Sequence, residues 1–418
     1  MPQNVPTPTQ GGETFPTEPS LTPQESMDQI ESQVQELRGL DVLQPVERQL
    51  LTTEGLRRHV LENFLKDYTP AEAHDDVLTL HAFGFLPSDF DLIALYTALY
   101  TEQVAGFYDD EVKAMYVVQG EAFGGPERMT YAHEFTHALQ DQHYDLRGNL
   151  KITDENCQQN SEYCAAVQSL VEGDATLVQE FWLTDYATSQ DYSEIYEFYG
   201  TFQSPVYDSA PEYMQQDFLF PYQQGKDFVR FLYERGGWEM VDAAYQTLPQ
   251  STEQILHPER YPDDTPVAVT VPDVRALLPD GWRQVDEGVM GEWYTYLMLS
   301  YGRDGVARQS EGEAAAAAEG WGGDAYRVYV SPDEQQFALV FDTTWDTTRD
   351  ANEFRHTLQR YISRRFNAST QNAGESAWAW EGEAGGYITL HQVDSRLVWL
   401  VAPDKATAEA MWQAIKSP

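Results

Sequence analysis

The chain has 418 residues, of which 42% are hydrophobic and 13% aromatic, so a disordered protein is excluded and two domains with accessory segments are expected. The formal net charge of −42 disfavours nucleic acid as a partner. No run of about 18 apolar residues occurs, so the sequence predicts no transmembrane segment. Either a salty environment or the acidity common among secreted bacterial proteins would account for the charge.

Residues 1–25 contain six prolines and no Lys or Arg, which predicts a disordered Pro/Thr-rich tether. Tethers of this kind follow secretion or lipoprotein signals. We therefore expect an extracellular or cell-surface protein, with a lipid-anchored tether as one form of it, whose signal peptide is not part of this sequence.

Two cysteines, Cys157 and Cys164, flank a short polar loop. Their spacing does not suit a CxxC redox pair or a zinc knuckle, and it favours a local disulfide in an oxidising compartment. Two free thiols in a cytosolic protein are the alternative.

Hydrophobic periodicity predicts a mainly helical domain with a small sheet over residues 26–271. A helix begins at Gln24, and a hairpin-like unit lies in VAGFYDD and KAMYVV. The other expected elements are a short extended piece at Val46–Leu51 and helices at Thr53–Lys66, Ala71–Ala82, Asp89–Glu102, Glu127–Gln142, Glu162–Thr184, Gly225–Arg235 and Glu239–Thr247.

Prolines become frequent after Tyr261, and we place a domain boundary near Pro272. Residues 272–418 are expected to form an α+β domain with an antiparallel sheet. Helices are expected near Gly288–Ser300, Arg349–Arg365 and Ala406–Ile415, with an alanine run at Ala314–Ala318. Strands are expected near Tyr326–Val330, Gln336–Thr343, Ala377–Glu381, Gly386–Val393 and Arg396–Ala402. The fold class expected for the whole chain is α+β.

The helix expected over Glu127–Gln142 contains His-Glu-x-x-His as His133, Glu134 and His137. Residues i and i+4 of a helix share a face, so both imidazoles can reach one ion. Zn²⁺ accepts such nitrogens, and Glu134 can take a proton from a water molecule that the metal acidifies. The motif predicts one Zn²⁺ per chain with Glu134 as general base. A buried helix whose histidines only form hydrogen bonds is the alternative.

Catalytic zinc needs a third protein ligand, and SLVEGDATLV on the next long helix offers Glu172. Gly173 and Ala175 are small, which we expect to let this helix approach the HExxH helix. Asp174 is the competing ligand. If Glu172 binds zinc, we expect Asp174 to support a ligating histidine or to face solvent.

These motifs resemble the gluzincin branch of zinc metallopeptidases. More narrowly, GFYDDEVKAMYVV, HEFTHALQDQHYDL and LVEGDATLV are similar to a poorly characterised set of secreted bacterial zinc peptidases, over roughly residues 40–262. The resemblance implies a zincin-like fold for residues 26–271. It also implies an edge strand that pairs with the substrate backbone, here Gly106–Tyr108 or Met115–Val118.

Tyr222 precedes Gly225 in FPYQQGKDFVRFL, at the expected start of a helix. The segment is similar to the Tyr-x-x-Gly segment of gluzincin aminopeptidases, whose tyrosine donates to the tetrahedral intermediate. This chain has Gln224 where those enzymes usually have Lys, so the match is partial. The resemblance implies that Tyr222 is an oxyanion donor. An ordinary packing role is the alternative, because the chain has 25 tyrosines.

Two further histidines, His143 and His257, are candidates for the site. His143 lies six residues after His137 and is expected to point away from the metal, whereas His257 lies in a turn that could bring it near the site. No Gly-Met-Asn exopeptidase motif precedes HExxH, which favours an endopeptidase.

The sequence therefore predicts a zinc-dependent peptidase that acts on peptide or protein substrates. A non-catalytic cell-surface or binding protein that keeps a peptidase fold is one alternative, and the intact Glu134 argues against it. A structural zinc module is another, and it would need a fourth protein ligand.

Overall fold

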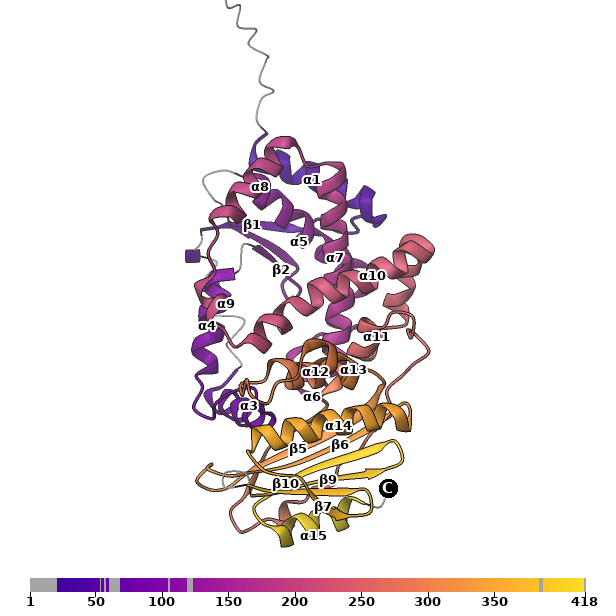
Figure 1. The fold of residues 1–418 in the computed structure, drawn as a ribbon. Coiled ribbons are helices and arrows are strands. Elements are labelled where there is room, and N and C mark those ends of the chain that lie inside the picture. The colour runs from indigo at the N-terminus through magenta and orange to yellow at the C-terminus, as the bar shows by residue number, and fades with distance from the viewer. Residues whose placement is uncertain are drawn as a thin grey trace, which may run out of the picture.

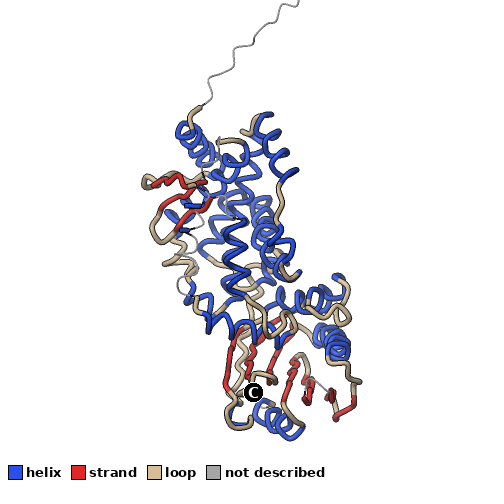
Figure 2. The backbone as a smooth tube through the Cα atoms, turned by 90° about the vertical axis from the view of Figure 1, so that its left-hand side faces the viewer, coloured by secondary structure: helices blue, strands red, loops and turns tan. Residues whose placement is uncertain are grey.

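The computed structural model of the protein describes residues 21–52, 54–55, 58–59, 68–103, 106–118, 123–382 and 386–416. The fold is α+β, as predicted. A helical N-terminal part carries a small sheet, and the C-terminal part contains a larger antiparallel sheet at the opposite end of the molecule (Figures 1 and 2). Within the described ranges, no helix is both long and apolar enough to cross a membrane.

The helical part follows the predicted periodicity over most of its length. The helix predicted at Thr53–Lys66 falls on residues of which only 54–55 and 58–59 are described. In chain order the elements are α1 (Pro23–Arg38), β1 (Glu47–Leu51), α3 (Pro70–Phe83), α4 (Leu92–Gln103), β2 (Gly106–Asp109), β3 (Ala114–Val118), α5 (Gly125–Tyr144), α6 (Asp154–Gln159), α7 (Ser161–Asp185), α8 (Ser189–Thr201), α9 (Pro205–Ser209), α10 (Glu212–Gln246) and α11 (Thr252–Leu256).

The small sheet has the strand order β1-β3-β2. β3 is central, pairing in parallel with β1 and antiparallel with β2. β2 and β3 form the predicted hairpin, and both contact α5. Of the two segments proposed as an edge strand, Gly106–Tyr108 therefore lies at an edge and Met115–Val118 in the centre.

α10 differs from the prediction. It begins at Glu212 and not near Gly225, whereas its break at Gly236 and Gly237, whose backbone angles are not helical, falls between the two helices that were predicted. Tyr222 is therefore not at a helix start but inside α10, directly after Pro221. The aromatic stretch before it, for which no helix was predicted, contains α8 and α9.

α7 lies between α5 and α10 and contacts both (Figure 1). A Cβ atom on Gly173 would lie 2.2 Å from the backbone carbon and oxygen of Gly225. Gly173 therefore permits the close approach of α7 to α10. Our expectation that it faces the HExxH helix was wrong, because adjacent residues of a helix point in different directions.

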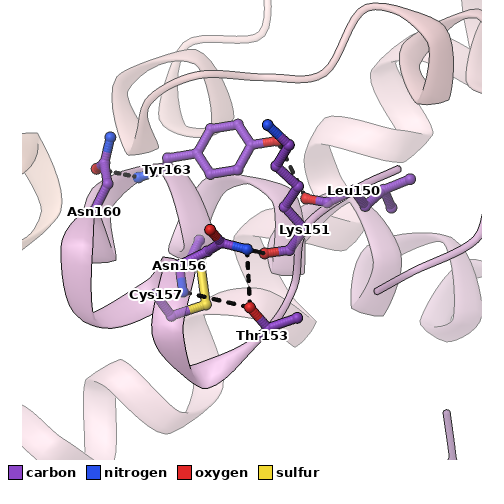
Figure 3. The surroundings of a disulfide bond; sticks show 8 residues. Leu150, Lys151, Thr153, Asn156, Cys157, Asn160 and Tyr163 are labelled. Atoms are coloured by element: carbon purple, nitrogen blue, oxygen red, sulfur yellow. Dashed lines mark hydrogen bonds between the residues drawn. A yellow bond between two sulfur atoms is a disulfide. The ribbon is translucent and has the colours of Figure 1, made fainter. Parts of the chain in front are cut away.

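The predicted disulfide is present. Cys157 of α6 and Cys164 of α7 are joined, with their Cα atoms 5.3 Å apart. Hydrogen bonds hold the surrounding loop in place (Figure 3): the Asn156 side chain donates to Thr153 Oγ1, and the Tyr163 hydroxyl donates to the carbonyl of Leu150. The disulfide fixes the start of α7.

The C-terminal part agrees with the predicted pattern but contains two strands that were not predicted, β4 and β7. Its elements are η1 (Arg275–Leu277), β4 (Arg283–Gly288), α12 (Gly291–Tyr301), α13 (Glu311–Ala318), β5 (Trp321–Val330), β6 (Phe337–Trp345), α14 (Thr348–Arg365), β7 (Gln371–Gly374), β8 (Ala377–Gly382), β9 (Gly386–Val393), β10 (Arg396–Ala402) and α15 (Lys405–Ile415). The strand order is β4-β5-β6-β10-β9-β8-β7, and every pairing is antiparallel.

Alternate residues of the central strands face two different layers. In β10, Trp399 belongs to the core beneath α14, whereas Val398 and Leu400 pack with α15. α3, from the N-terminal part, contacts the same sheet, and its Phe83 meets Phe341 and Trp399 edge to face. One buried apolar cluster thus runs from the helical part onto one face of the sheet. The domain division at residue 272 remains a prediction.

Candidate metal centre

α5 holds the HExxH motif inside the protein. Ala132, Phe135, Ala138 and Leu139 are fully buried, which fixes the helix against its neighbours. His133 and His137 are each less than a tenth exposed and project from the same face, with their ring centroids 4.8 Å apart. The apolar surroundings therefore leave the two imidazoles few directions in which to point.

α7 brings Glu172 to these imidazoles. Glu172 Oε2 lies 3.1 Å from His133 Nε2 and 3.3 Å from His137 Nε2, and the two Nε2 atoms are 3.1 Å apart. Atoms about 2.0–2.1 Å from a tetrahedral ion lie about 3.3 Å from one another. The three donor atoms thus have the mutual spacing of ligands around one such ion.

Gln140 determines which nitrogen of His137 carries the proton. Its side-chain nitrogen faces two acceptors, the carbonyl of Val171 at 2.9 Å and Asp174 Oδ2 at 3.1 Å. Its oxygen therefore faces His137 Nδ1, at 2.8 Å, and accepts a hydrogen bond from an N–H at that position. The lone pair of neutral His137 then lies on Nε2, which faces Glu172. Donor atoms held this close together favour a cation between them, and the donor set suits a metal ion.

Asp174 does not lie with the imidazoles. It is fully buried and accepts hydrogen bonds from Arg38 Nε at 2.8 Å and from the Tyr245 hydroxyl at 2.8 Å. Arg38 is also fully buried, and its Nη2 pairs with Asp242 at 2.8 Å. The structure thus brings Glu172 to the histidines and places Asp174 behind them, where it contacts His137 through Gln140.

Glu134 lies beside the three donor atoms, and its orientation is fixed by the small sheet. The backbone N–H of Tyr108, in β2, donates to Glu134 Oε2 at 3.0 Å. The Tyr108 hydroxyl in turn donates to Asp141 on α5 at 2.7 Å, which ties β2 to the HExxH helix. Burial raises the pKa of Glu134, and the two imidazoles and the Tyr108 amide oppose this rise.

The pKa values of His137 and Glu172 reflect the short distance between their side chains. Burial alone would lower the pKa of His137, but the Glu172 carboxylate outweighs it and raises that pKa to about 10. Burial likewise acts to raise the pKa of Glu172, but His137 and His133 hold it well below its usual range. Both shifts show a carboxylate and an imidazole that stabilise each other's charge.

Tyr222 approaches the site from α10. Its ring centroid lies 6.0 Å from that of His133, and 42% of the residue is exposed. The chain thus provides a hydroxyl-bearing side chain on the accessible side of the candidate centre.

His143 and His257, the other candidate histidines, have different partners. His143 Nε2 bonds the carbonyl oxygen of Asp41 at 2.8 Å, consistent with its predicted direction away from the metal face. His257 Nε2 bonds Glu292 at 2.9 Å and is not among the residues that converge at the site. Near it, three carboxylates gather around the guanidinium of Arg260, namely those of Glu253, Asp264 and Asp346. All three carboxylates of this second cluster therefore already pair with one guanidinium.

Sequence reasoning missed three residues of the centre: Arg38, Tyr108 as an amide donor, and Gln140. Gln140 had a recognisable signal, because it lies three residues after His137 on the same helical face. Arg38 had no recognisable signal in the sequence, because 136 residues separate it from Asp174.

Comparison with known proteins adds one finding. Residues 277–412 match the domain of unknown function DUF8575. This segment is less than half of the chain and contains none of the residues of the candidate metal centre. No curated protein and no solved structure matches the chain.

Proposed function

We propose that the protein is a zinc-dependent peptidase that hydrolyses peptide bonds, most simply as an endopeptidase. The observation that carries this proposal is the convergence of His133, His137 and Glu172 beside Glu134. Among the described residues this cluster offers three protein ligands, and catalytic zinc sites keep the fourth position open whereas structural sites close it.

His133, His137 and Glu172 would hold one Zn²⁺ per chain. When bound, Zn²⁺ supplies Lewis-acid chemistry, polarising a carbonyl group and lowering the pKa of water. We assign the proton transfers to Glu134. Its Oε2 is held by the Tyr108 amide, so Oε1 accepts the proton of the attacking water and later delivers it to the leaving amine.

The outer edge of β2 is suited to bind the substrate backbone. Tyr108 pairs with Met115 of β3, and its N–H points away from β3 toward Glu134. Because backbone groups alternate along a strand, those of Gly106 also face this edge. A substrate that pairs with the backbone groups of Gly106 at this edge would lie beside Glu134, to which the Tyr108 N–H is already bonded.

Glu134→Gln tests the proposal. The variant should bind about one zinc per chain, measured by metal analysis, and lose about 10²–10⁴-fold in the rate of casein hydrolysis, because an amide cannot accept the proton. Glu239→Gln, which changes an exposed glutamate of α10, should keep the wild-type rate. A chelator should abolish hydrolysis, and zinc should restore it. Hydrolysis that survives either Glu134→Gln or the chelator would reject the proposal.

Tyr222→Phe tests the proposed oxyanion donor. It should leave zinc binding and KM nearly unchanged while kcat falls about 10²–10³-fold, because the donor acts on charge that develops in the transition state. An unchanged kcat would leave Tyr222 as a packing residue.

We also propose an extracellular or cell-surface location. The disulfide between Cys157 and Cys164 supports it, because such bonds persist in oxidising compartments.

A further inference from the structure

Exposed aromatic side chains are concentrated in one stretch of the chain. Among the described residues, the aromatic side chains with large exposed fractions all lie between residues 192 and 222. Five belong to α8 and the residue that ends it: Tyr192, Tyr196, Phe198, Tyr199 and Phe202. Phe218 and Tyr222 lie on α10, next to the exposed Leu219. Apolar exposure gathered in this way marks an interaction surface rather than ordinary scattered residues.

Of these five aromatic side chains, those of Phe198, Tyr199 and Phe202 contact one another, and all five are exposed to solvent. Tyr196 is 83% exposed. Phe198 lies 5.1 Å from Phe202 and 5.3 Å from Tyr199, measured between ring centroids. The only buried residue of α8 is Asp191. The second half of this helix therefore presents stacked rings to solvent.

The same stretch is strongly acidic. Residues 152–225 contain thirteen Asp and Glu and no Lys, Arg or His. Some of these carboxylates have partners from outside the stretch, as Asp191 and Glu194 pair with Arg128. Glu197 and Asp208 take part in no ion pair between described residues. The aromatic rings of α8 thus lie among carboxylates that are not fully neutralised.

α8 and α10 each connect to an element of the candidate metal centre. Asp191 and Glu194 anchor α8 to the start of α5, the HExxH helix, through Arg128 and the backbone N–H of Gly125. From α8 the chain descends through α9 and returns along α10 (Figure 1), where Tyr222 reaches His133. The exposed face of α10, formed by Phe218, Leu219 and Tyr222, therefore ends at the proposed reaction site.

We propose that the aromatic residues of α8 and the exposed face of α10 form a docking surface for the substrate, and that this substrate is a cationic peptide with apolar side chains. The inference rests on the proposed peptidase function and names its substrate class. Lys and Arg side chains bind aromatic faces, and neighbouring carboxylates strengthen the attraction. A second copy of a chain with a charge of −42 would instead be repelled, as would an anionic membrane.

The test measures binding without turnover, in the zinc-loaded Glu134→Gln protein. The probe is a fluorescein-labelled peptide of about twelve residues in which Lys or Arg alternates with Leu, and the matched peptide has Glu at the basic positions. Fluorescence anisotropy should give at least about tenfold tighter binding of the cationic peptide, and added NaCl should weaken it.

The docking surface is then altered by changing Tyr196, Tyr199 and Phe202 to Ser together. These side chains are exposed, so the thermal midpoint should stay close to that of the parent protein, and affinity for the cationic peptide should fall about tenfold. Glu197→Gln should cause a smaller loss that disappears in high salt. Val306→Ser changes an apolar residue that is 77% exposed elsewhere and should bind the peptide like the parent protein.

Several results would overturn the docking surface. Equal affinity for the two peptides would show that the surface does not select cationic substrates. An unchanged affinity after the triple substitution would show that α8 is not part of the docking surface. Binding to zwitterionic vesicles, or self-association in light scattering, that the triple substitution abolishes would assign the surface to a membrane or to a second copy. If the peptide binds as expected but the wild-type zinc protein does not cleave it, the peptidase proposal fails and the docking surface stands.

Discussion

Gly173→Ala should disturb both the stability of the protein and its candidate metal centre. The new Cβ would lie 2.2 Å from the backbone of Gly225, whereas ordinary contacts begin at 3.4 Å. α7 and α10 would have to separate by about 1 Å, because no flexible side chain can yield there, and overpacking of this kind costs about 1–3 kcal/mol or more. The higher helix propensity of Ala relative to Gly offsets at most about 1 kcal/mol of this cost.

Urea unfolding measures the first effect. The free energy of unfolding of Gly173→Ala should fall by about 1–3 kcal/mol in the presence of a chelator. Gly200→Ala is the matched control, because it lies in α8 with no atom within 4 Å of its new Cβ, and its free energy should be unchanged or slightly higher.

Zinc titration measures the second effect. Because Glu172 precedes Gly173, a displaced α7 moves one of the three donor atoms, and zinc affinity should fall at least about tenfold. A Gly173→Ala protein as stable as the wild type would refute the claim that these helices meet through glycine. Lower stability with unchanged zinc affinity would refute the dependence of the metal centre on that contact.

Two further predictions concern buried carboxylates. Asp174→Asn leaves the buried Arg38 with only the partly exposed Asp242 as counter-charge, so the free energy of unfolding should fall by up to about 3–5 kcal/mol and zinc affinity about 10–100-fold. The exposed Asp185→Asn is the control, and no change in either quantity would contradict the Arg38–Asp174–Gln140 connection. Burial raises the pKa of Glu162 from 4.5 to about 8, so the folded protein keeps a proton that the unfolded chain releases, and the free energy of unfolding should fall as pH rises from 5 to 7. Glu162→Gln should make this slope shallower by up to about 1.4 kcal/mol per pH unit, as measured by urea unfolding at pH 5, 6 and 7. An unchanged slope would contradict the raised pKa of Glu162 in the folded protein.

The sequence predicted those elements whose burial follows a regular period. α1, α3 and α7 bury one side of a helix or more, and β5, β6, β8, β9 and β10 alternate or bury long apolar runs. β4 and β7 were missed because neither strand has a buried face that could produce a pattern. α8 was also missed, although Tyr192, Tyr196 and Tyr199 recur at the spacing of one helical face.

The candidate centre was predictable where its geometry is local. His133 and His137 share a helical face by spacing alone, and the Glu-Gly-Asp segment of the next long helix offered Glu172, with Asp174 as the competing ligand. The long-range contacts were not predictable, because Arg38 reaches Asp174 across 136 residues, and the Tyr108 amide reaches Glu134 only because β2 lies beside α5. Backbone donors leave no mark in a sequence.

The Glu-Gly-Asp segment of α7 shows why these three residues occur in succession. Consecutive residues of a helix point about 100° apart, so Glu172 faces the imidazoles of α5, Gly173 faces Gly225 of α10, and Asp174 faces Arg38 of α1. Each direction needs a different residue: a long carboxylate to reach the donor atoms, no side chain where two backbones meet, and a short carboxylate beside a buried guanidinium. α7 is thus enclosed on three sides at the level of the candidate centre. The packing that stabilises the helical part is therefore the same packing that positions Glu172, which is why substitutions behind the metal centre are expected to change zinc affinity without touching a ligand.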